Sequence, residues 1–333
     1  MSIRIGINGF GRIGRTVMRI LLTQKQKDFQ IVHINDLTDP ATTAHLLKYD
    51  SVHGGLSNTI TPGESSLIVD GQTISISAIR SPAEIPWKEK KVDIVFECTG
   101  IFRKKKDVED HMKAGAPRVL ISAPAVGEDL TVVYGVNHDQ LKSHHTMVSN
   151  GSCTTNCLAP PTKIIHEAFT ILSAAMTTIH SYTNDQSILD LPHSDLRRAR
   201  AAALSMIPTS TGAAQAIGLV LPSLKGKIDG IAVRVPTPNV SLVDATYFVN
   251  KPTTAAEVND LLKKATQGSL KNIMDFTMEP LVSIDFNGNP HSSIVDGAMT
   301  KVLNGTTIKI LAWYDNEVGF SHRMLDVAKL MVS

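Results

Sequence analysis

A glycine-rich turn near the N-terminus constrains the fold of this chain more than any other feature. Residues 9–14 read Gly-Phe-Gly-Arg-Ile-Gly, directly after an apolar run and at the start of a helical pattern, and Asp36 ends the next strand-like run. Such glycines allow a tight turn and the close approach of a pyrophosphate to a helix N-terminus, while the acid accepts hydrogen bonds from ribose hydroxyls. The pattern predicts a Rossmann-type sheet that binds a dinucleotide. A glycine turn that binds nothing is the alternative.

The acid at position 36 also bears on the kind of dinucleotide. A carboxylate there would repel a 2′-phosphate, so Asp36 favours NAD over NADP. The backbone N–H groups of Arg12 and Ile13, at the predicted helix start, are expected to face the pyrophosphate.

Strand and helix patterns alternate in the first half of the chain and then stop alternating. Strand-like runs at 3–7, 30–34, 92–98, 118–122, 131–136 and 146–149 alternate with helical patterns, as in parallel βαβ units. Later runs lie at 228–235, 241–249, 281–286, 293–296 and 307–314, with helical spacing over 255–267 and 319–331. We expect an α/β protein with a Rossmann-type doubly wound parallel sheet over 1–150, completed by a C-terminal helix over 316–333. A second, α+β domain with a mixed or antiparallel sheet is expected over 151–315.

Composition limits the partners of the chain. With 333 residues and 42% hydrophobic residues, it can bury cores for two domains. The formal net charge of +2 is too small to attract nucleic acid or an anionic membrane by bulk charge, so any anion site is expected to be local. No run approaches the roughly 18 apolar residues of a membrane span, and no signal peptide is apparent. Three cysteines, an odd number, then indicate free thiols in the cytoplasm.

The segment 149–157 places a cysteine where its thiol can be activated. It reads Ser-Asn-Gly-Ser-Cys-Thr-Thr-Asn-Cys and leads into a helical pattern, which predicts Cys153 near a helix N-terminus. The helix dipole there lowers the pKa of a thiol. The same residues also fit a buried, inert cysteine or a turn rich in capping side chains. Cys157 follows at i+4, but no second Cys or His pair has zinc-like spacing, so we expect no metal.

A base and anion-binding groups follow further along the chain. Among 12 histidines, His180 is the best candidate for a base beside the thiol, because it ends a strand-like run, although a lone histidine is more often structural. Segments 195–200, 208–212 and 233–236 supply arginines and hydroxyls that bind phosphate well. An arginine is also often part of a surface ion pair.

Seven segments together resemble the phosphorylating glyceraldehyde-3-phosphate dehydrogenase family. They are INGFGRIGR (7–15), SNGSCTTNCLAP (149–160), HSYTNDQ (180–186), DLRRARAAA (195–203), PTSTGAA (208–214), AVRVPTPNVS (232–241) and WYDNEVGFSHR (313–323). The resemblance implies NAD-dependent oxidation and phosphorylation of D-glyceraldehyde 3-phosphate to 1,3-bisphosphoglycerate through a cysteine thioester, in glycolysis or gluconeogenesis. It also implies a homotetramer.

The resemblance assigns roles to individual residues. It makes Cys153 the nucleophile and His180 the base and acid. For the phosphate of glyceraldehyde 3-phosphate it implies Thr183, Asp185 and Arg234, and for inorganic phosphate Ser152, Thr154, Arg197, Thr211 and Gly212. For NAD it implies Phe10, Gly11, Arg12, Ile13, Asp36, Arg80, Thr99, Ser122 and Asn316.

Four positions depart from the residues usual in that family. They are Gly151 for Ala, Pro161 after the usual Pro160, Phe320 for Tyr and His322 for Asn. None removes a group that the chemistry needs, and the consecutive prolines predict a kinked helix.

Two alternatives compete with this interpretation. One is erythrose-4-phosphate dehydrogenase, a close relative, against which Thr183 argues. The other, of a different class, is a secondary role in binding RNA or host ligands. The small net charge does not support nucleic acid as a primary partner.

Overall fold

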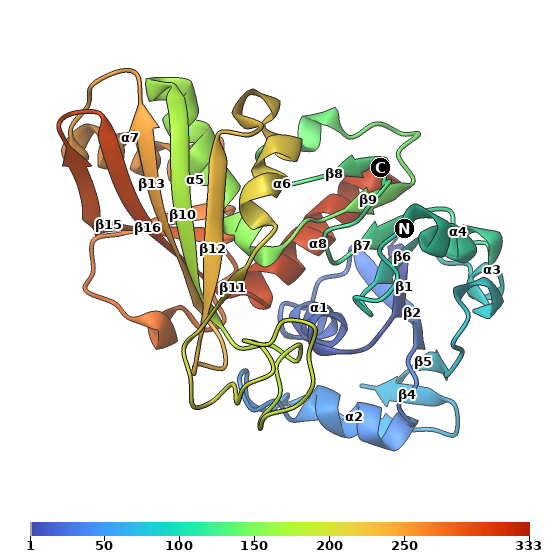
Figure 1. The fold of residues 1–333 in the computed structure, drawn as a ribbon. Coiled ribbons are helices and arrows are strands. Elements are labelled where there is room, and N and C mark those ends of the chain that lie inside the picture. The colour runs from blue at the N-terminus through green and yellow to red at the C-terminus, as the bar shows by residue number, and fades with distance from the viewer. Residues whose placement is uncertain (1) are drawn as a thin grey trace. The chain divides into compact units, whose positions relative to one another are not determined.

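A computed structural model describes residues 2–333, which divide into two compact units. The first comprises the residues up to Val132 together with His138–Gly151 and Ser321–Ser333. The second comprises Val133–Asn137 and Ser152–Phe320. Figure 1 follows the elements of both along the chain.

The first unit contains a nine-stranded sheet with the order β3-β4-β5-β2-β1-β6-β7-β9-β8. All its strands pair in parallel except at one edge, where β3, β4 and β5 pair antiparallel. The chain extends the sheet from β1 on one side and later returns to pair β6 on the other, which creates a topological switch point between β1 and β6. The strands are β1 (Ile3–Asn8), β2 (Phe29–Asn35), β3 (Ile60–Pro62), β4 (Ser66–Val69), β5 (Gln72–Ser77), β6 (Ile94–Glu97), β7 (Val119–Ile121), β8 (Leu130–Thr131) and β9 (Met147–Ser149).

Helix α1 packs on this sheet through an apolar face. Val17, Ile20 and Leu21 are buried, and Arg19 on the same helix is buried as well because it donates to the backbone oxygens of Leu47 and Gly54. The helices of this unit are α1 (Arg12–Thr23), α2 (Pro40–Lys48), α3 (Trp87–Lys90) and α4 (Lys105–Lys113), with 3₁₀ turns at Pro82–Glu84 and His138–Gln140. Most of α8 (Val318–Val332) also belongs here.

The second unit contains a seven-stranded mixed sheet, as the sequence predicts. Its order is β11-β12-β10-β13-β16-β15-β14; β10 pairs with β12, and β14 with β15, in parallel, and the other pairs are antiparallel. The strands are β10 (Ile171–Ser181), β11 (Ile207–Ser210), β12 (Ile228–Val235), β13 (Ser241–Val249), β14 (Met274–Thr277), β15 (Ser293–Leu303) and β16 (Thr307–Tyr314).

Three helices lie along one face of this sheet and enclose its core (Figure 1). They are α5 (Cys153–Phe169), α6 (Ala213–Val220) and α7 (Ala255–Gln267), and 3₁₀ turns occupy Pro222–Leu224 and Ser283–Phe286. Helix α7 begins with a capping box between Thr254 and Glu257. The prolines at 160 and 161 do not end α5, which continues through both. Within residues 2–333, no helix combines the length and apolar character that crossing a membrane requires.

Two predicted strands are wrong, and side chains explain both. Over 131–136 only Thr131 continues a strand, because the Asn137 side chain accepts from the N–H of Val133 at 2.8 Å and closes a turn. Over 281–286 the chain forms a 3₁₀ turn, in which the Asp285 carboxylate accepts from the N–H of Val282 at 2.8 Å. In both places a side chain competes with strand pairing for the backbone donor.

A substitution at Gly14 tests how closely α1 packs on the glycine turn. A Cβ at Gly14 would lie 2.6 Å from the backbone oxygen of Gly9. Such overpacking costs about 3 kcal/mol, of which helix propensity restores about 1, so Gly14→Ala should lower the free energy of unfolding by about 2 kcal/mol. At Gly11 a Cβ would meet nothing within 4 Å, so Gly11→Ala is the matched control and should cost about 1 kcal/mol or less. Equal urea midpoints for the two variants would contradict this packing.

Candidate active site

The start of helix α5 holds the candidate nucleophile. Ser152 caps the helix, because its hydroxyl accepts from the N–H of Thr155 at 3.1 Å, and Cys153 is the first helical residue. Gly151, which precedes the cap, has a φ of +65°, a conformation that glycine adopts without strain and alanine does not. Glycine at position 151, where the family usually has alanine, therefore suits the local backbone conformation.

The thiol of Cys153 lies beside the imidazole of His180. Sγ is 3.5 Å from Nε2 of His180, which is the second-last residue of β10. The adjacent strand β12 places Arg234 directly opposite His180 in register. One helix start and two paired strand ends thus bring together three side chains that the sequence separates widely.

The other ring nitrogen of His180 has two partners of opposite kind. Nδ1 is 2.7 Å from the backbone oxygen of Ser181 and 3.0 Å from Nη1 of Arg234. If Nδ1 donates to the carbonyl, Nε2 accepts the thiol proton; if Nδ1 accepts from the guanidinium, Nε2 carries a proton toward Sγ. Each tautomer has a partner, so His180 can both take and give a proton at Nε2.

Burial dominates the electrostatics of this pair. It raises the pKa of the Cys153 thiol and lowers the pKa of the His180 imidazole, so each group alone favours its neutral form. The charge of Arg234 lowers both pKa values, and hydrogen bonding with Thr154 further lowers that of the thiol. The helix start alone predicts a lowered thiol pKa, but burial outweighs that effect.

The other two cysteines are less suited to react. Cys157 is fully buried, and its Sγ lies 3.6 Å from both the Ser293 hydroxyl and the Ala312 carbonyl oxygen. Burial raises its pKa far more than any neighbour lowers it. Burial also raises the pKa of Cys98 to about 12. Cys153 is the thiol with both a cation and an imidazole beside it.

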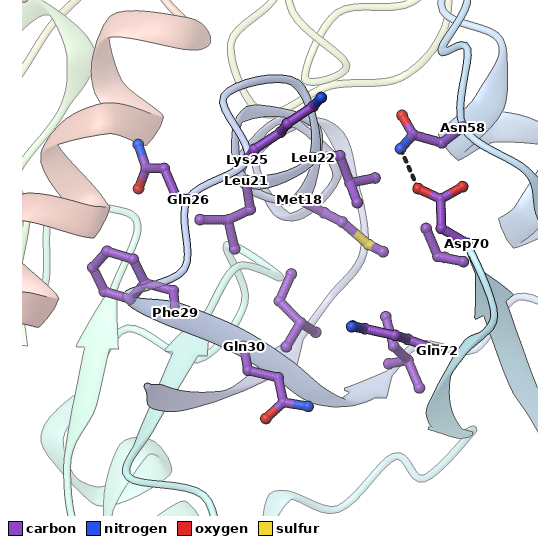
Figure 2. A pocket seen from close by; sticks show the side chains of 13 residues that line it. Met18, Leu21, Leu22, Lys25, Gln26, Phe29, Gln30, Asn58, Asp70 and Gln72 are labelled. Carbon is purple, nitrogen blue, oxygen red and sulfur yellow. Dashed lines mark hydrogen bonds between the residues drawn. The ribbon is translucent and has the colours of Figure 1, made fainter. Parts of the chain in front are cut away.

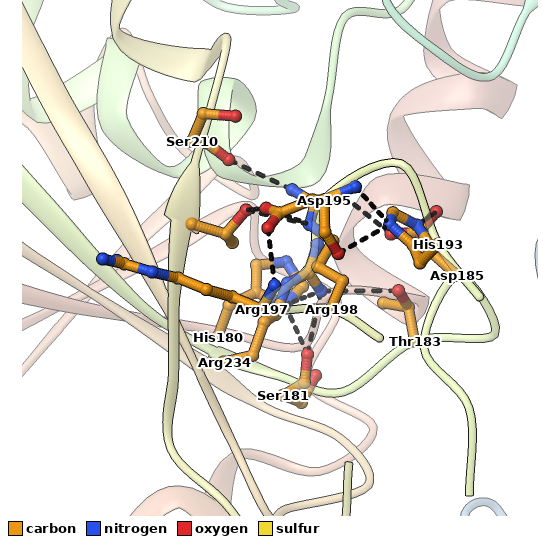
Figure 3. Close-up of polar contacts among 11 residues, drawn as sticks. His180, Ser181, Thr183, Asp185, His193, Asp195, Arg197, Arg198, Ser210 and Arg234 are labelled. Carbon is orange, nitrogen blue, oxygen red and sulfur yellow. Dashed lines mark hydrogen bonds and ion pairs between the residues drawn. The ribbon is translucent and has the colours of Figure 1, made fainter. Parts of the chain in front are cut away.

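Polar groups predicted to bind phosphate gather around Arg234 and Asp185 (Figure 3). Nη1 of Arg234 donates to the Ser181 carbonyl at 3.0 Å and to the Thr183 hydroxyl at 3.4 Å. Asp185 forms an ion pair with Arg198 at 2.7 Å. The structure thus places Thr183, Asp185 and Arg234 near one another, as the resemblance implies.

Arg198, rather than Arg197, joins this cluster. Besides Asp185, Arg198 contacts the Thr209 hydroxyl at 2.9 Å and the Ser210 carbonyl at 3.1 Å. Arg197 is exposed, and within residues 2–333 its guanidinium has no hydrogen-bond partner. The sequence shows two adjacent arginines and gives no sign of which one faces inward.

The remaining residues predicted for inorganic phosphate lie at two helix starts. Thr154 follows Cys153, and its hydroxyl is 2.8 Å from that of Tyr314. Thr211 and Gly212 precede α6, where Gly212 is the N-cap and the Thr211 hydroxyl accepts from the N–H of Ala213 at 3.2 Å.

Tyr314 is a residue that the sequence analysis missed. Its hydroxyl also lies 2.9 Å from that of Thr178, and its ring packs edge-on to the His180 ring with centroids 6.0 Å apart. Tyr314 lies within segment 313–323, one of the seven segments that carry the family resemblance, and its place there is the sequence signal that could have pointed to it.

The first unit assembles the predicted dinucleotide residues around the glycine turn. Asp36 accepts from the N–H of Phe10 at 2.6 Å and from that of Thr38 at 2.9 Å. Helix α1 begins at Arg12 without a capping side chain, with Gly11 as its N-cap. Thr99 follows β6 and Ser122 follows β7, while Arg80 is exposed after β5. These residues therefore lie at the carboxyl ends of neighbouring strands.

Asn316, predicted to contact the nicotinamide, belongs to the second unit. Its Oδ1 accepts from the hydroxyls of Ser181 at 2.9 Å and Ser241 at 3.2 Å. These two bonds fix which end of the amide is the donor.

A cavity of about 340 Å³ in the first unit is not part of this arrangement. It lies at the last turn of α1 and the start of β2, and its lining mixes apolar side chains such as Met18 and Phe29 with polar ones such as Asn58 and Asp70, as Figure 2 shows. None of the predicted site residues lines it.

Comparison with known proteins identifies the family. The profile "Glyceraldehyde 3-phosphate dehydrogenase, NAD binding domain" matches residues 3–105, and "Glyceraldehyde 3-phosphate dehydrogenase, C-terminal domain" matches residues 152–316. Glyceraldehyde-3-phosphate dehydrogenase of Geobacillus stearothermophilus is 55% identical over 335 residues, covering 100% of this chain and 99% of the relative. This chain belongs to the glyceraldehyde 3-phosphate dehydrogenase family.

Other members of the family agree. Glyceraldehyde-3-phosphate dehydrogenase 1 of Bacillus cereus is 56% identical over 331 residues, covering 99% of this chain and 98% of the relative. Glyceraldehyde-3-phosphate dehydrogenase 1 of Bacillus subtilis strain 168 is 54% identical over 329 residues, covering 98% of each. The α/β fold class with an NAD-binding, Rossmann-like sheet and a second mixed sheet is confirmed.

The effect of Arg234 on the thiol can be measured directly. Because its charge favours the thiolate, Arg234→Leu should raise the pKa of Cys153 and slow alkylation by iodoacetamide severalfold at pH 7. The rate-versus-pH profile should move to higher pH. Arg103→Leu, at an exposed arginine of the first unit, is the control and should leave the profile unchanged. An unaltered profile in Arg234→Leu would contradict the electrostatic role.

Proposed function

We propose that this family member oxidises D-glyceraldehyde 3-phosphate with NAD and inorganic phosphate to 1,3-bisphosphoglycerate, through a thioester on Cys153. The observation that carries the proposal is the 3.5 Å contact between Sγ of Cys153 and Nε2 of His180, at the start of a helix and beside Arg234. A thiol needs such a partner to become a nucleophile near neutral pH.

The glycine turn has the shape that NAD requires. At Gly11 a Cβ would meet nothing within 4 Å, so the backbone is open to a close-lying pyrophosphate. We propose that Phe10, Gly11, Arg12 and Ile13 hold the pyrophosphate, and that Asp36, Arg80, Thr99, Ser122 and Asn316 hold the rest of the cofactor. When bound, NAD supplies the hydride acceptor that no side chain provides.

The first step of the proposed chemistry forms a carbon–sulfur bond. Nε2 of His180 takes the thiol proton, Sγ attacks the aldehyde carbon, and His180 returns the proton to the aldehyde oxygen. The product is a hemithioacetal on Cys153. Both tautomers of His180 have a partner at Nδ1, which supports its use as acceptor and then as donor.

The second step returns the proton to His180. Nε2 takes the hydroxyl proton of the hemithioacetal, and the hydride of the same carbon would pass to the acceptor that bound NAD supplies, which leaves a thioester on Cys153. The backbone N–H of Cys153, at the helix start, can stabilise the thioester oxygen. Because a thioester stays reactive, the free energy of the oxidation is kept for the transfer to phosphate.

Two groups of residues would position the two phosphates. Thr183, Asp185 and Arg234 would hold the phosphate of the substrate, close to His180. For inorganic phosphate we propose Ser152, Thr154, Thr211 and Gly212, together with Arg197 from the resemblance. The contacts of Arg198 with the Thr209 hydroxyl and the Ser210 carbonyl, directly before Thr211, support Arg198 as a further cation there. A phosphate oxygen then attacks the thioester carbon, the carbon–sulfur bond breaks, and the thiolate is released.

Substitution of the nucleophile should abolish the reaction while leaving NAD binding intact. Cys153→Ser should abolish NADH formation from glyceraldehyde 3-phosphate, because a serine hydroxyl beside His180 is a far weaker nucleophile. NAD affinity should stay close to that of the unsubstituted protein. The assay follows NADH absorbance with and without phosphate, and with erythrose 4-phosphate in parallel. Substantial turnover by the variant, or turnover independent of phosphate, would overturn the assignment.

We further propose a cytoplasmic homotetramer. The loop at 187–206 exposes large apolar side chains, with Ile188, Leu196 and Leu204 each at least 80% exposed. A cluster of this kind on one loop marks a surface covered by another chain. All three cysteines are free thiols, which supports a reducing compartment.

A single substitution that introduces a charged side chain into the proposed interface tests the oligomeric state. Light scattering should give four copies of the 36.0 kDa chain. Leu204→Asp should shift the mass toward smaller species, because a charge in an apolar interface is left unpaired. Val126→Asp, at a 69% exposed residue of the first unit, is the matched control. A monomeric unsubstituted chain would contradict the proposal.

A further inference from the structure

A buried carboxylate that the proposed chemistry does not use lies next to the switch point of the first unit. Glu97 is the last residue of β6 and is 1% exposed. Its Oε2 accepts from Nδ2 of Asn8 at 2.6 Å and lies 3.0 Å from Nε2 of His111. Its Oε1 accepts from the N–H of Thr99 at 2.8 Å and from the hydroxyl of the same residue. Both oxygens are therefore satisfied, as burial of a charged group demands.

His111 donates to Glu97 because its other nitrogen is already occupied. Nε1 of Trp87 lies 3.0 Å from Nδ1 of His111, and an indole N–H can only donate. The proton of the neutral imidazole is then on Nε2, directed at Glu97. Trp87 and His111 are both fully buried. The indole thereby fixes the tautomer of His111, so that its Nε2–H always points at Glu97.

The Glu97 carboxylate joins two loops at the carboxyl ends of adjacent strands. Asn8 ends β1 and directly precedes Gly9, while Thr99 follows β6. The loops touch, because a Cβ at Gly9 would lie 2.7 Å from the backbone nitrogen of Thr99. Doubly wound sheets bind their ligand at this place, outside the strand ends at the switch point.

The same chain of hydrogen bonds extends to the strand that leads to Asp36. Oδ1 of Asn8 accepts from Nδ2 of Asn35 at 2.8 Å, and Oδ1 of Asn35 accepts from the Ser77 hydroxyl at 2.7 Å. Asn35 ends β2 and directly precedes Asp36. Side chains at the ends of β6, β1, β2 and β5 thus form one continuous buried network.

We propose that Glu97, held by His111 and Trp87, is a positioning residue for the dinucleotide. It acts through Asn8 and Thr99, which set the spacing between the glycine turn and the loop after β6. The inference rests on the proposed cofactor role of these loops. Its effect is on NAD affinity and leaves the chemistry of the Cys153 thiol unchanged, because every member of the network belongs to the first unit.

The test compares three variants of the full chain by calorimetric titration with NAD. Glu97→Gln keeps the shape but turns one acceptor into a donor, which faces either Asn8 and His111 or the N–H of Thr99, so the Kd for NAD should rise about tenfold. Trp87→Phe removes the indole N–H and frees the His111 tautomer, which should raise the Kd two- to fivefold. Ile94→Ala, on the same strand, is the matched control: it opens a cavity in the core and should lower Tm without changing the Kd.

Two further measurements separate positioning from general destabilisation. The KM for NAD should rise in Glu97→Gln, while kcat at saturating NAD and the alkylation rate of Cys153 stay unchanged. If Glu97→Gln binds NAD like Ile94→Ala, the inference is overturned. If Glu97→Gln does not fold, an unchanged Kd in Trp87→Phe overturns it instead. Failure of the unsubstituted chain to bind NAD would overturn the proposed function as well, so the two failures are distinguishable.

Discussion

The contact between one sulfur and one imidazole nitrogen depends on three elements keeping a fixed register. Helix α5 presents Cys153 at its first position, β10 presents His180 at its end, and β12 presents Arg234 opposite it. Tyr314 ties the helix to the strand, since its hydroxyl bonds with Thr154 on one and Thr178 on the other. A shift of one residue in the pairing of β10 with β12 would turn His180 or Arg234 to the other face of the sheet.

The charges around this contact concentrate positive charge in one place on a chain that is nearly neutral. Arg198 and Arg234 are close enough for the charge of Arg198 to lower the pKa of Arg234, although burial lowers it more. Asp185 and Asp195 both form ion pairs with Arg198, at 2.7 Å and 3.7 Å. A phosphate bound there would relieve the repulsion between two cations. The anion attraction is therefore local, in keeping with a formal net charge of +2.

Much of the fold could be predicted because the periodic segments carry their own signals. Residues 241–249, 255–267 and 307–314 form the predicted elements with the predicted bounds. Strand predictions failed where one side chain, Asn137 or Asp285, accepts a hydrogen bond from the backbone and forms a turn instead. The spacing of apolar residues in a sequence does not reveal a single local hydrogen bond of this kind. The resemblance assigned Arg197, whereas Arg198 joins the cluster, because loop geometry decides which of two adjacent arginines faces inward.

The sequence also did not reveal the pKa of the Cys153 thiol or the hydrogen-bond network around Glu97. A helix start predicts an acidic thiol, but the depth of burial that opposes it is a property of the assembled unit. Glu97 lies in an apolar run and gives no sequence sign of the four hydrogen bonds it accepts. Pairing between strands distant in sequence creates such networks, and single-segment patterns do not contain that information.

The indole behind His111 has a consequence for how this family can change over evolutionary time. A histidine held in this way cannot be replaced by an apolar residue alone, since such a substitute leaves the indole N–H without its acceptor and a carboxylate oxygen without one of its donors. Trp87, Glu97 and His111 should therefore drift as a linked set. An exchange at a position outside this triad, such as Asp36, would leave these hydrogen bonds in place.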